Sequence, residues 1–373
     1  MGYLLPFFFV LLVVVFIHEM GHFLVGRWCG VKVEAFSIGF GPEIAGWTDK
    51  KGTRWRLAAL PLGGYVKFFG DANAASVPDP SAANALSPEE RALTLAGQEV
   101  WKRAAIVAAG PIANFLLAIA IFSGNAYVYG DNVVRPVVAK VVAGGAAEKA
   151  GFLAGDLVIS IDGRPIDGFA QLQDAVSLNP GSPLRIVVRR ADADVALNVT
   201  PELRTVEVKP FGPQKFGVIG VQADSGPGAL RHVSFGPVGA LGRGLDETWG
   251  VVARTGVYLR GLVAGRQPAD QISGPIGVGA MAGAVAKIGF GALLSLVALF
   301  SVSIGLMNLM PIPMLDGGHL LYYAIEGVRG RPLSERSQEI GFRIGLAFVA
   351  LVFLFATSND LFRLVPRLFG RAG

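Results

Sequence analysis

Residues 1–26 read MGYLLPFFFVLLVVVFIHEMGHFLVG, an apolar run long enough to cross a bilayer, with no charge before Glu19. An ionisable side chain inside a membrane segment is costly and indicates a functional site. His18 and His22 lie four residues apart, so on a helix they share one face, where their ring nitrogens can bind one zinc ion. Glu19 is then placed to take a proton from water at the metal. The stretch therefore predicts metal-dependent chemistry inside a membrane.

The composition of the whole chain also indicates a membrane protein. Of 373 residues, 52% are hydrophobic and 16% are charged, and the mean hydropathy is +0.51. The net charge of +5 fits basic loops at a membrane surface, so we expect no nucleic-acid partner. The single cysteine, Cys29, excludes an internal disulfide. The N-terminal run lacks the basic start and the cleavage site of a signal peptide, so we interpret it as a retained helix.

Segments at about 3–26, 104–127, 289–310 and 340–357 have the length and apolarity of transmembrane helices. We therefore predict an α-helical polytopic membrane protein with about four spans. Basic residues collect in cytoplasmic loops, and here they follow the first and the third predicted helix. They are Arg27, Lys32, Lys50, Lys51, Arg54, Arg56, Lys67, Lys102 and Arg103, then Arg329, Arg331, Arg336 and Arg343. Only Arg363, Arg367 and Arg371 in the C-terminal tail argue against this orientation. The stretch between helices two and three, and both termini, are thus predicted to lie outside the cytoplasm.

A second constellation follows the third predicted helix and reads NLMPIPMLDGGH from Asn308 to His319. Pro311 and Pro313 break the helix, and irregular backbone at membrane depth is tolerated only where it is buried in protein or lines a cavity. Asp316 is therefore a candidate third metal ligand, completing with the two histidines a tetrahedral site that keeps water in the fourth position. The alternative is a helix-capping aspartate. His319 is a candidate supporting residue or an interfacial one.

The stretch between helices two and three contains a predicted folded module at about 135–202. Its sequence alternates strand-like runs with glycine turns, and Asp162–Gly163 predicts a tight hairpin. Residues 169–178 predict a helix with its apolar side chains on one face, and residues 183–190 and 195–200 predict a further hairpin. The pattern resembles a bacterial, circularly permuted PDZ domain. That resemblance implies that the module binds peptide ends or extended segments by strand addition. The alternative is a β-rich domain that only blocks access.

The two motifs together, HExxH in the first helix and NxxPxPxLDGGH about 290 residues later, resemble the site-2 protease (M50-type) family of intramembrane zinc metalloproteases. The order of parts is similar to the bacterial regulator-of-sigma-E protease type. The resemblance implies that His18, His22 and Asp316 bind zinc, that Glu19 is the general base, and that Asn308 holds the substrate backbone. The chain departs from the best-known member in having one recognisable PDZ module where that protein has two.

Other segments fit this resemblance. Residues 54–70 (RWRLAALPLGGYVKFFG) are too apolar for a solvated loop and predict a membrane-re-entrant β-hairpin, whose exposed edge could pair with an unwound substrate. Gly63 and Gly64 at its middle, with Pro311, are candidate substrate-binding residues. Asn114, an amide inside the second helix, is a candidate supporting residue. Residues 72–98 predict a flexible linker.

The predicted parts are a first membrane part at 1–130, the inserted α+β PDZ domain at 135–202, a connector with an amphipathic surface helix at 203–288, and a second membrane part at 289–373. The resemblance implies an enzyme of the bacterial inner membrane that uses Zn²⁺, and the basic loops predict that the metal lies near the cytoplasmic side. Its substrates would be transmembrane segments of single-pass proteins in regulated proteolysis, for example an anti-sigma factor already cut outside the membrane, and its periplasmic PDZ domain would gate their entry. The alternatives are a non-proteolytic PDZ-based binding protein or a metal transporter. Glu19 argues against both, because neither needs a general base.

Overall fold

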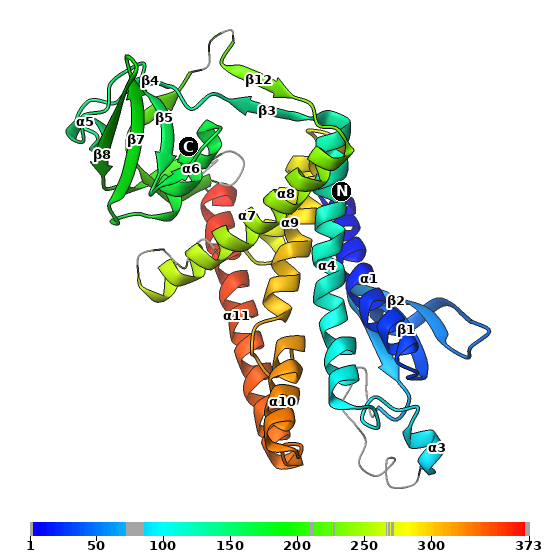
Figure 1. Ribbon diagram of the computed structural model, residues 1–373. Coiled ribbons are helices and arrows are strands. Elements are labelled where there is room, and N and C mark those ends of the chain that lie inside the picture. The colour runs from blue at the N-terminus through cyan, green and yellow to red at the C-terminus, as the bar shows by residue number, and fades with distance from the viewer. Residues whose placement is uncertain are drawn as a thin grey trace. The chain divides into compact units, whose positions relative to one another are not determined.

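The computed structural model describes residues 3–71, 86–208, 212–224, 226, 228–265, 267, 269 and 272–369 (Figure 1). The chain divides into two compact units. The first unit contains Met1–Phe122 and Val278–Ser358, and the second contains Ser123–Gly277 and Asn359–Gly373. Each unit has its own core.

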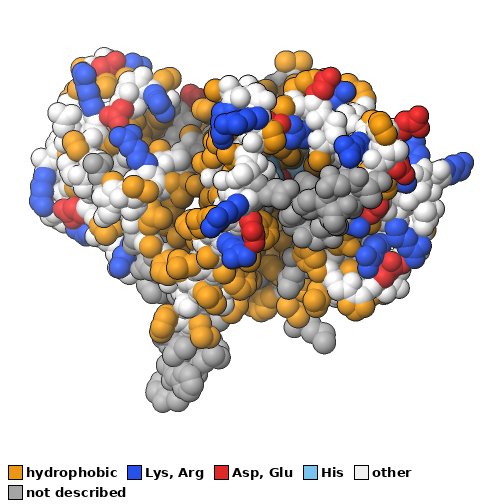
Figure 2. Space-filling view, turned by 90° about the horizontal axis from the view of Figure 1, so that it is seen from below, with side chains coloured by type: hydrophobic (Ala, Val, Ile, Leu, Met, Phe, Trp, Pro, Cys, Tyr) orange, Lys and Arg blue, Asp and Glu red, His pale blue; other side chains and the backbone are white. Residues whose placement is uncertain are grey.

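Among the described residues, four helices are long and apolar enough to cross a membrane. They are α1 (Leu4–Trp28), α4 (Val100–Tyr129), α9 (Phe290–Asn308) and the Arg336–Phe362 part of α11 (Glu335–Phe369). Helices α4 and α11 extend beyond the predicted spans at about 104–127 and 340–357, which were limited to the most apolar stretches. Apolar side chains such as Leu116, Leu351 and Leu354 are 60%, 65% and 65% exposed, as expected for helices that contact lipid. Hydrophobic side chains also cover much of the face shown in Figure 2. The chain is a polytopic membrane protein.

A twisted antiparallel sheet is built from β1 (Val33–Thr48) and β2 (Arg54–Phe68). The two halves of β2 lie on opposite sides of the first part of β1, since Phe36 pairs with both Trp55 and Val66, while the end of β1 pairs with the first half of β2 alone. The hairpin predicted within 54–70 is therefore wrong in its pairing, because each arm pairs with β1 and not with the other arm. Gly63, with φ of +143°, lies where β2 bends. The strand β1 was not predicted.

The first unit has two apolar clusters. One joins α1, the sheet and α4 through side chains that include Phe23, Phe36 and Ile106. The other joins α1 and α9 to α8 (Pro275–Ala286), with Ala282 fully buried. Most of α8 thus belongs to the first unit, although its sequence was assigned to the connector at 203–288. An amphipathic helix, α10 (Asp316–Arg329), follows α9.

The predicted flexible linker at 72–98 is only partly described. Residues 72–85 lie outside the described residues. The rest adopts a short helix and turns that pack against the first unit, where an unstructured linker was predicted. Ser87 and Glu90 form a capping box at the start of α3 (Pro88–Arg91), and Leu95 is buried in the cluster around Phe36.

The second unit contains the predicted module. A sheet of order β6-β5-β7-β8 is covered by α6 (Phe169–Leu178), whose Leu172 and Val176 are buried in one apolar core. The helix and both hairpins are confirmed. Strand β11 pairs with β4, so the sheet structure continues beyond residue 202. The remaining elements are β3 (Asp131–Val134), β4 (Val138–Val141), α5 (Ala146–Lys149), β5 (Leu157–Ile161), β6 (Arg164–Pro165), β7 (Leu184–Arg190), β8 (Ala193–Val199), β9 (Glu202–Val208), β10 (Gly212–Val218), β11 (Val221–Ala223), β12 (Leu230–Val233) and α7 (Pro237–Val263).

Candidate metal centre

Three predicted ligands meet in the first unit. His18 Nε2 lies 3.2 Å from Asp316 Oδ2, and His22 Nε2 lies 3.6 Å from Asp316 Oδ1. The two Nε2 atoms are 3.2 Å apart. One ligand atom from each residue can be chosen so that all lie within 4.8 Å of one another. The structure therefore brings together side chains that are separated by almost 300 residues in the sequence.

Local structure explains how Asp316 reaches the histidines. Met314 has a φ of +86°, which is unusual for a residue with a side chain, and Asp316 then begins α10. A methyl group on Gly317 would overlap the carbonyl oxygens of Leu309 and Met310. The glycine therefore lets the first turn of α10 lie directly against the end of α9. This tight connection turns the carboxylate toward α1.

The imidazole of His22 is held in one orientation by α4. Its Nδ1 lies 2.9 Å from the carbonyl oxygen of Ile106, which can only accept a hydrogen bond. Nδ1 therefore carries the proton, and Nε2 keeps the lone pair that a metal needs. A backbone carbonyl in this position is a usual orienting partner of a metal-binding histidine.

The residues present fit a metal ion. Two histidines and one carboxylate, with room for water, are a donor set typical of catalytic zinc. Asp316 Oδ2 is buried and makes no hydrogen bond with the described residues, as expected for an oxygen reserved for an ion. Gly110 of α4 faces both rings, and a Cβ there would lie 2.9 Å from His18 Cε1 and closer still to His22 Nε2. The missing side chain keeps the space beside the nitrogens open.

Glu19 lies next to this group, between the two histidines in sequence. The backbone N–H of Val66 in β2 donates a hydrogen bond to its carboxylate. A Cβ on Gly64 would lie 3.2 Å from Glu19 Cγ. The second half of β2 therefore runs beside the predicted general base.

Of the other predicted site residues, two asparagines lie beside His18 and the remaining residues lie outside the ligand group. Asn308 Nδ2 lies 3.3 Å from His18 Nε2, and Asn114 Nδ2 lies 3.3 Å from His18 Nδ1. Gly63 is at the bend of β2, and Pro311 is exposed between α9 and α10. His319 follows Asp316 by one turn of α10 and does not join the ligand group that the described residues form.

Two groups that shape the candidate metal centre were not predicted from the sequence. The carbonyl of Ile106 leaves no signal, since every residue has a carbonyl. Gly110 lies four residues before Asn114 and shares its helix face, and this spacing is the signal that could have found it.

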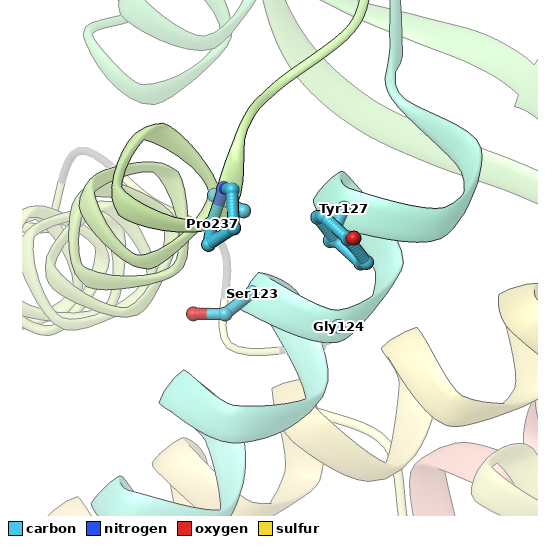
Figure 3. Close-up of a pocket in the computed structure, with 5 residues that line it drawn as sticks. Ser123, Gly124, Tyr127 and Pro237 are labelled. Carbon is cyan, nitrogen blue, oxygen red and sulfur yellow. The ribbon is translucent and has the colours of Figure 1, made fainter.

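A separate cavity of about 420 Å³ lies in the second unit, between the end of α4 and the start of α7 (Figure 3). It is lined by Ser123, Gly124, Tyr127, Pro237 and Ala240. These residues offer no carboxylate, imidazole or thiol, so the cavity cannot supply the chemistry that the metal centre can.

Comparison with known proteins shows the family of the chain. The family model described as Peptidase family M50 matches residues 6–352. This chain belongs to Peptidase family M50. Relatives named "Putative zinc metalloprotease" include Atu1380 of Agrobacterium fabrum, 50% identical over 98% of this chain and 97% of the relative. Another is R01501 of Rhizobium meliloti, 50% identical over 96% of each chain. The Metalloprotease MmpA of Caulobacter vibrioides is 42% identical over 96% of this chain and 95% of the relative. The M50 match includes every candidate ligand and Glu19.

Proposed function

We propose that this M50 peptidase is an intramembrane zinc metalloprotease that cleaves transmembrane segments of single-pass membrane proteins. Membership of Peptidase family M50 makes the chain a metalloprotease, and several of its relatives are named zinc metalloproteases. The observation that carries the proposal is the convergence of His18, His22 and Asp316 within 4.8 Å. Two of these ligands belong to α1, a helix of membrane-spanning length.

The roles of the side chains follow from their positions. Zinc, when bound, supplies a Lewis acid that activates water and polarises a peptide carbonyl. Glu19 accepts the proton of the attacking water and delivers it to the leaving amine. The Asn308 amide, 3.3 Å from His18 Nε2, is close enough to hold the substrate backbone beside the ligands.

The substrate must become extended before it is cut, because a helix hides its carbonyls in i to i−4 hydrogen bonds. The 64–68 half of β2 pairs with β1 on one side, and its Val66 N–H bonds Glu19. An extended segment added along this strand would bring its peptide bonds to the general base. Gly63 and Gly64 in β2, and Pro311, which is exposed between α9 and α10, would be further contacts of the substrate.

We further propose that the module in the second unit is a PDZ domain that gates substrate entry, as in the regulator-of-sigma-E protease type. Peptide ends, or bulky domains that it excludes, would be its partners. The distribution of Lys and Arg supports a bacterial inner-membrane enzyme with its metal near the cytoplasmic side, and with the module and both termini in the periplasm. An anti-sigma factor already cut outside the membrane is the kind of substrate that this arrangement suits.

The test is Glu19→Gln in the full-length protein, with a single-pass reporter as substrate. We expect the variant to keep zinc and to lose cleavage, because the amide cannot accept the proton. Glu34→Gln is the matched control, since Glu34 forms an ion pair with Lys67 at 2.8 Å and lies outside the ligand group. Cleavage by the Glu19 variant at the wild-type rate would refute the protease mechanism.

A further inference from the structure

The side-chain amide of Asn114 in α4 is buried, and only one of its two polar atoms has a hydrogen-bond partner among the described residues. Its exposed fraction is 0%, and its Nδ2 lies 3.3 Å from His18 Nδ1. Its Oδ1 is also buried, yet that oxygen has no hydrogen-bond partner among the described residues. A buried acceptor without a donor costs on the order of 1–3 kcal/mol, so the arrangement calls for an explanation.

Helix α9 fixes the backbone of Asn114. The Ser301 hydroxyl donates to the Asn114 carbonyl oxygen at 2.8 Å, and a Cβ on Gly305 would lie 3.3 Å from Asn114 Cβ. The side chain therefore has little freedom except rotation of its amide plane. That rotation exchanges Nδ2 and Oδ1 without changing the shape of the side chain.

Hydrogen-bond chemistry selects between the two amide orientations. If Nδ2 faces the ring, it can only donate, so His18 Nδ1 must be the unprotonated nitrogen and Nε2 carries the proton. A protonated Nε2 cannot bind a metal. If Oδ1 faces the ring, it accepts the Nδ1–H and Nε2 keeps the lone pair that a metal needs, while Nδ2 takes the position that Oδ1 held.

The same helix face serves His22. Ile106, Gly110 and Asn114 are spaced by four residues, so they lie on one face of α4. The Ile106 carbonyl accepts from His22 Nδ1, and Gly110 leaves room beside both rings. Only His18 lacks an assigned acceptor in this series.

We propose that Asn114 is a positioning residue whose Oδ1 accepts the Nδ1–H of His18, so that α4 sets the tautomer of both metal-binding histidines. This rests on the zinc site of the proposed function but not on the identity of its substrate.

The first test compares zinc affinity, by chelator competition, in full-length Asn114→Leu and Asn114→Asp. Leucine has a similar size but no acceptor, whereas aspartate keeps an acceptor oxygen. We expect the leucine variant to bind zinc about 10–100-fold more weakly and the aspartate variant to bind it as the wild type does. Asn359→Leu, which removes an amide that bonds the Ala269 and Ile272 carbonyls, is the matched control. Wild-type affinity in Asn114→Leu, or equal losses in all three variants, would overturn the proposal.

A second measurement needs no variant and covers the case in which leucine prevents folding. The nitrogen chemical shifts of ¹⁵N-labelled histidine in zinc-free protein report which ring nitrogen is protonated, and the chain has only 4 histidines to assign. We expect Nδ1–H at His18, and Nε2–H there would overturn the proposal. A protein with this tautomer that binds zinc but cleaves nothing would instead refute the proposed function alone.

Discussion

Buried polar side chains have different roles in the first unit and in the module of the second unit. In the first unit, His18, Asn114 and Ser301 are between 0% and 9% exposed, and all belong to the surroundings of the candidate metal centre. In the module, Asp156 is 1% exposed, but it bonds Arg190 and the Leu153 backbone beside an apolar core. Apolar surroundings offer no water to satisfy imidazoles and amides, so these groups must satisfy one another. The buried polar side chains of α1, α4 and α9 therefore indicate chemistry, whereas buried Asp156 stabilises the module locally.

The largest effect should come from Asp316→Ala. If Asp316 is a zinc ligand, its loss should weaken zinc binding by more than about 100-fold, because even residues that only orient ligands contribute 10–100-fold. Cleavage of the reporter should disappear with the zinc. A helix cap would instead cost only about 1 kcal/mol of stability. Metal content of the purified variant, measured by mass spectrometry, decides the matter, and full zinc occupancy would show that the ligand assignment is wrong.

A comparison of two glycines on α4 should give the next largest effect. The added methyl of Gly110→Ala would meet both metal-binding rings, whereas a methyl at Gly124 would meet nothing within 4 Å. We expect Gly110→Ala to lose most zinc affinity and activity. Gly124→Ala should keep both and should stabilise the helix by up to about 1 kcal/mol. Equal zinc affinity of the two variants in a zinc titration would show that the absence of a side chain at Gly110 is not needed for metal binding.

Excision of the module should change substrate choice but not catalysis. Val134 of β3 pairs with Leu230 of β12, so the cut ends at about 136 and 228 can be rejoined by a short glycine linker. If the module gates entry, the shortened protein should keep zinc and should cleave reporters that still carry large outside domains. The measurement is the cleavage rate for reporters with and without such a domain. Loss of all activity in a variant that inserts and binds zinc would make the module part of the catalytic machinery.

The sequence predicted what depends on local pattern. Long apolar runs gave α1, α4, α9 and α11, and the spacing of His18 and His22 predicted their shared face. Asp316 was found because prolines and glycines around it break a helix at membrane depth. The sequence did not predict that β1 separates the two halves of β2, because strand pairing is set by tertiary contacts. The contribution of the Ile106 carbonyl is likewise invisible in sequence, since it depends only on where α4 lies.

The smallest effect should come from the module's own buried charge. Arg190 donates two hydrogen bonds of 2.8 Å to Asp156, and the Leu153 N–H donates a third of 2.9 Å. Burial opposes ionisation of Asp156, but these donors outweigh it and hold its pKa below the ordinary value. A depressed pKa means that this stabilisation is present above the unfolded pKa of about 3.9 and is lost as the pH falls through the folded value.

Asp156→Asn should therefore lower the unfolding temperature of the module by roughly a few degrees at pH 7. The difference from the wild type should shrink as the pH falls below about 4, where first the unfolded chain and then the folded Asp156 carboxylate takes up a proton. Exposed Asp167→Asn is the matched control and should leave the profile unchanged. Hydrogen exchange of the module's amides in the full-length protein, followed from pH 7 downward, measures the stability of the module in both variants. If the stability difference between Asp156→Asn and the wild type did not change with pH, Asp156 would act through its shape and hydrogen bonds and not through its charge. The variant should bind zinc as the wild type does, because Asp156 stabilises the module and takes no part in the candidate metal centre.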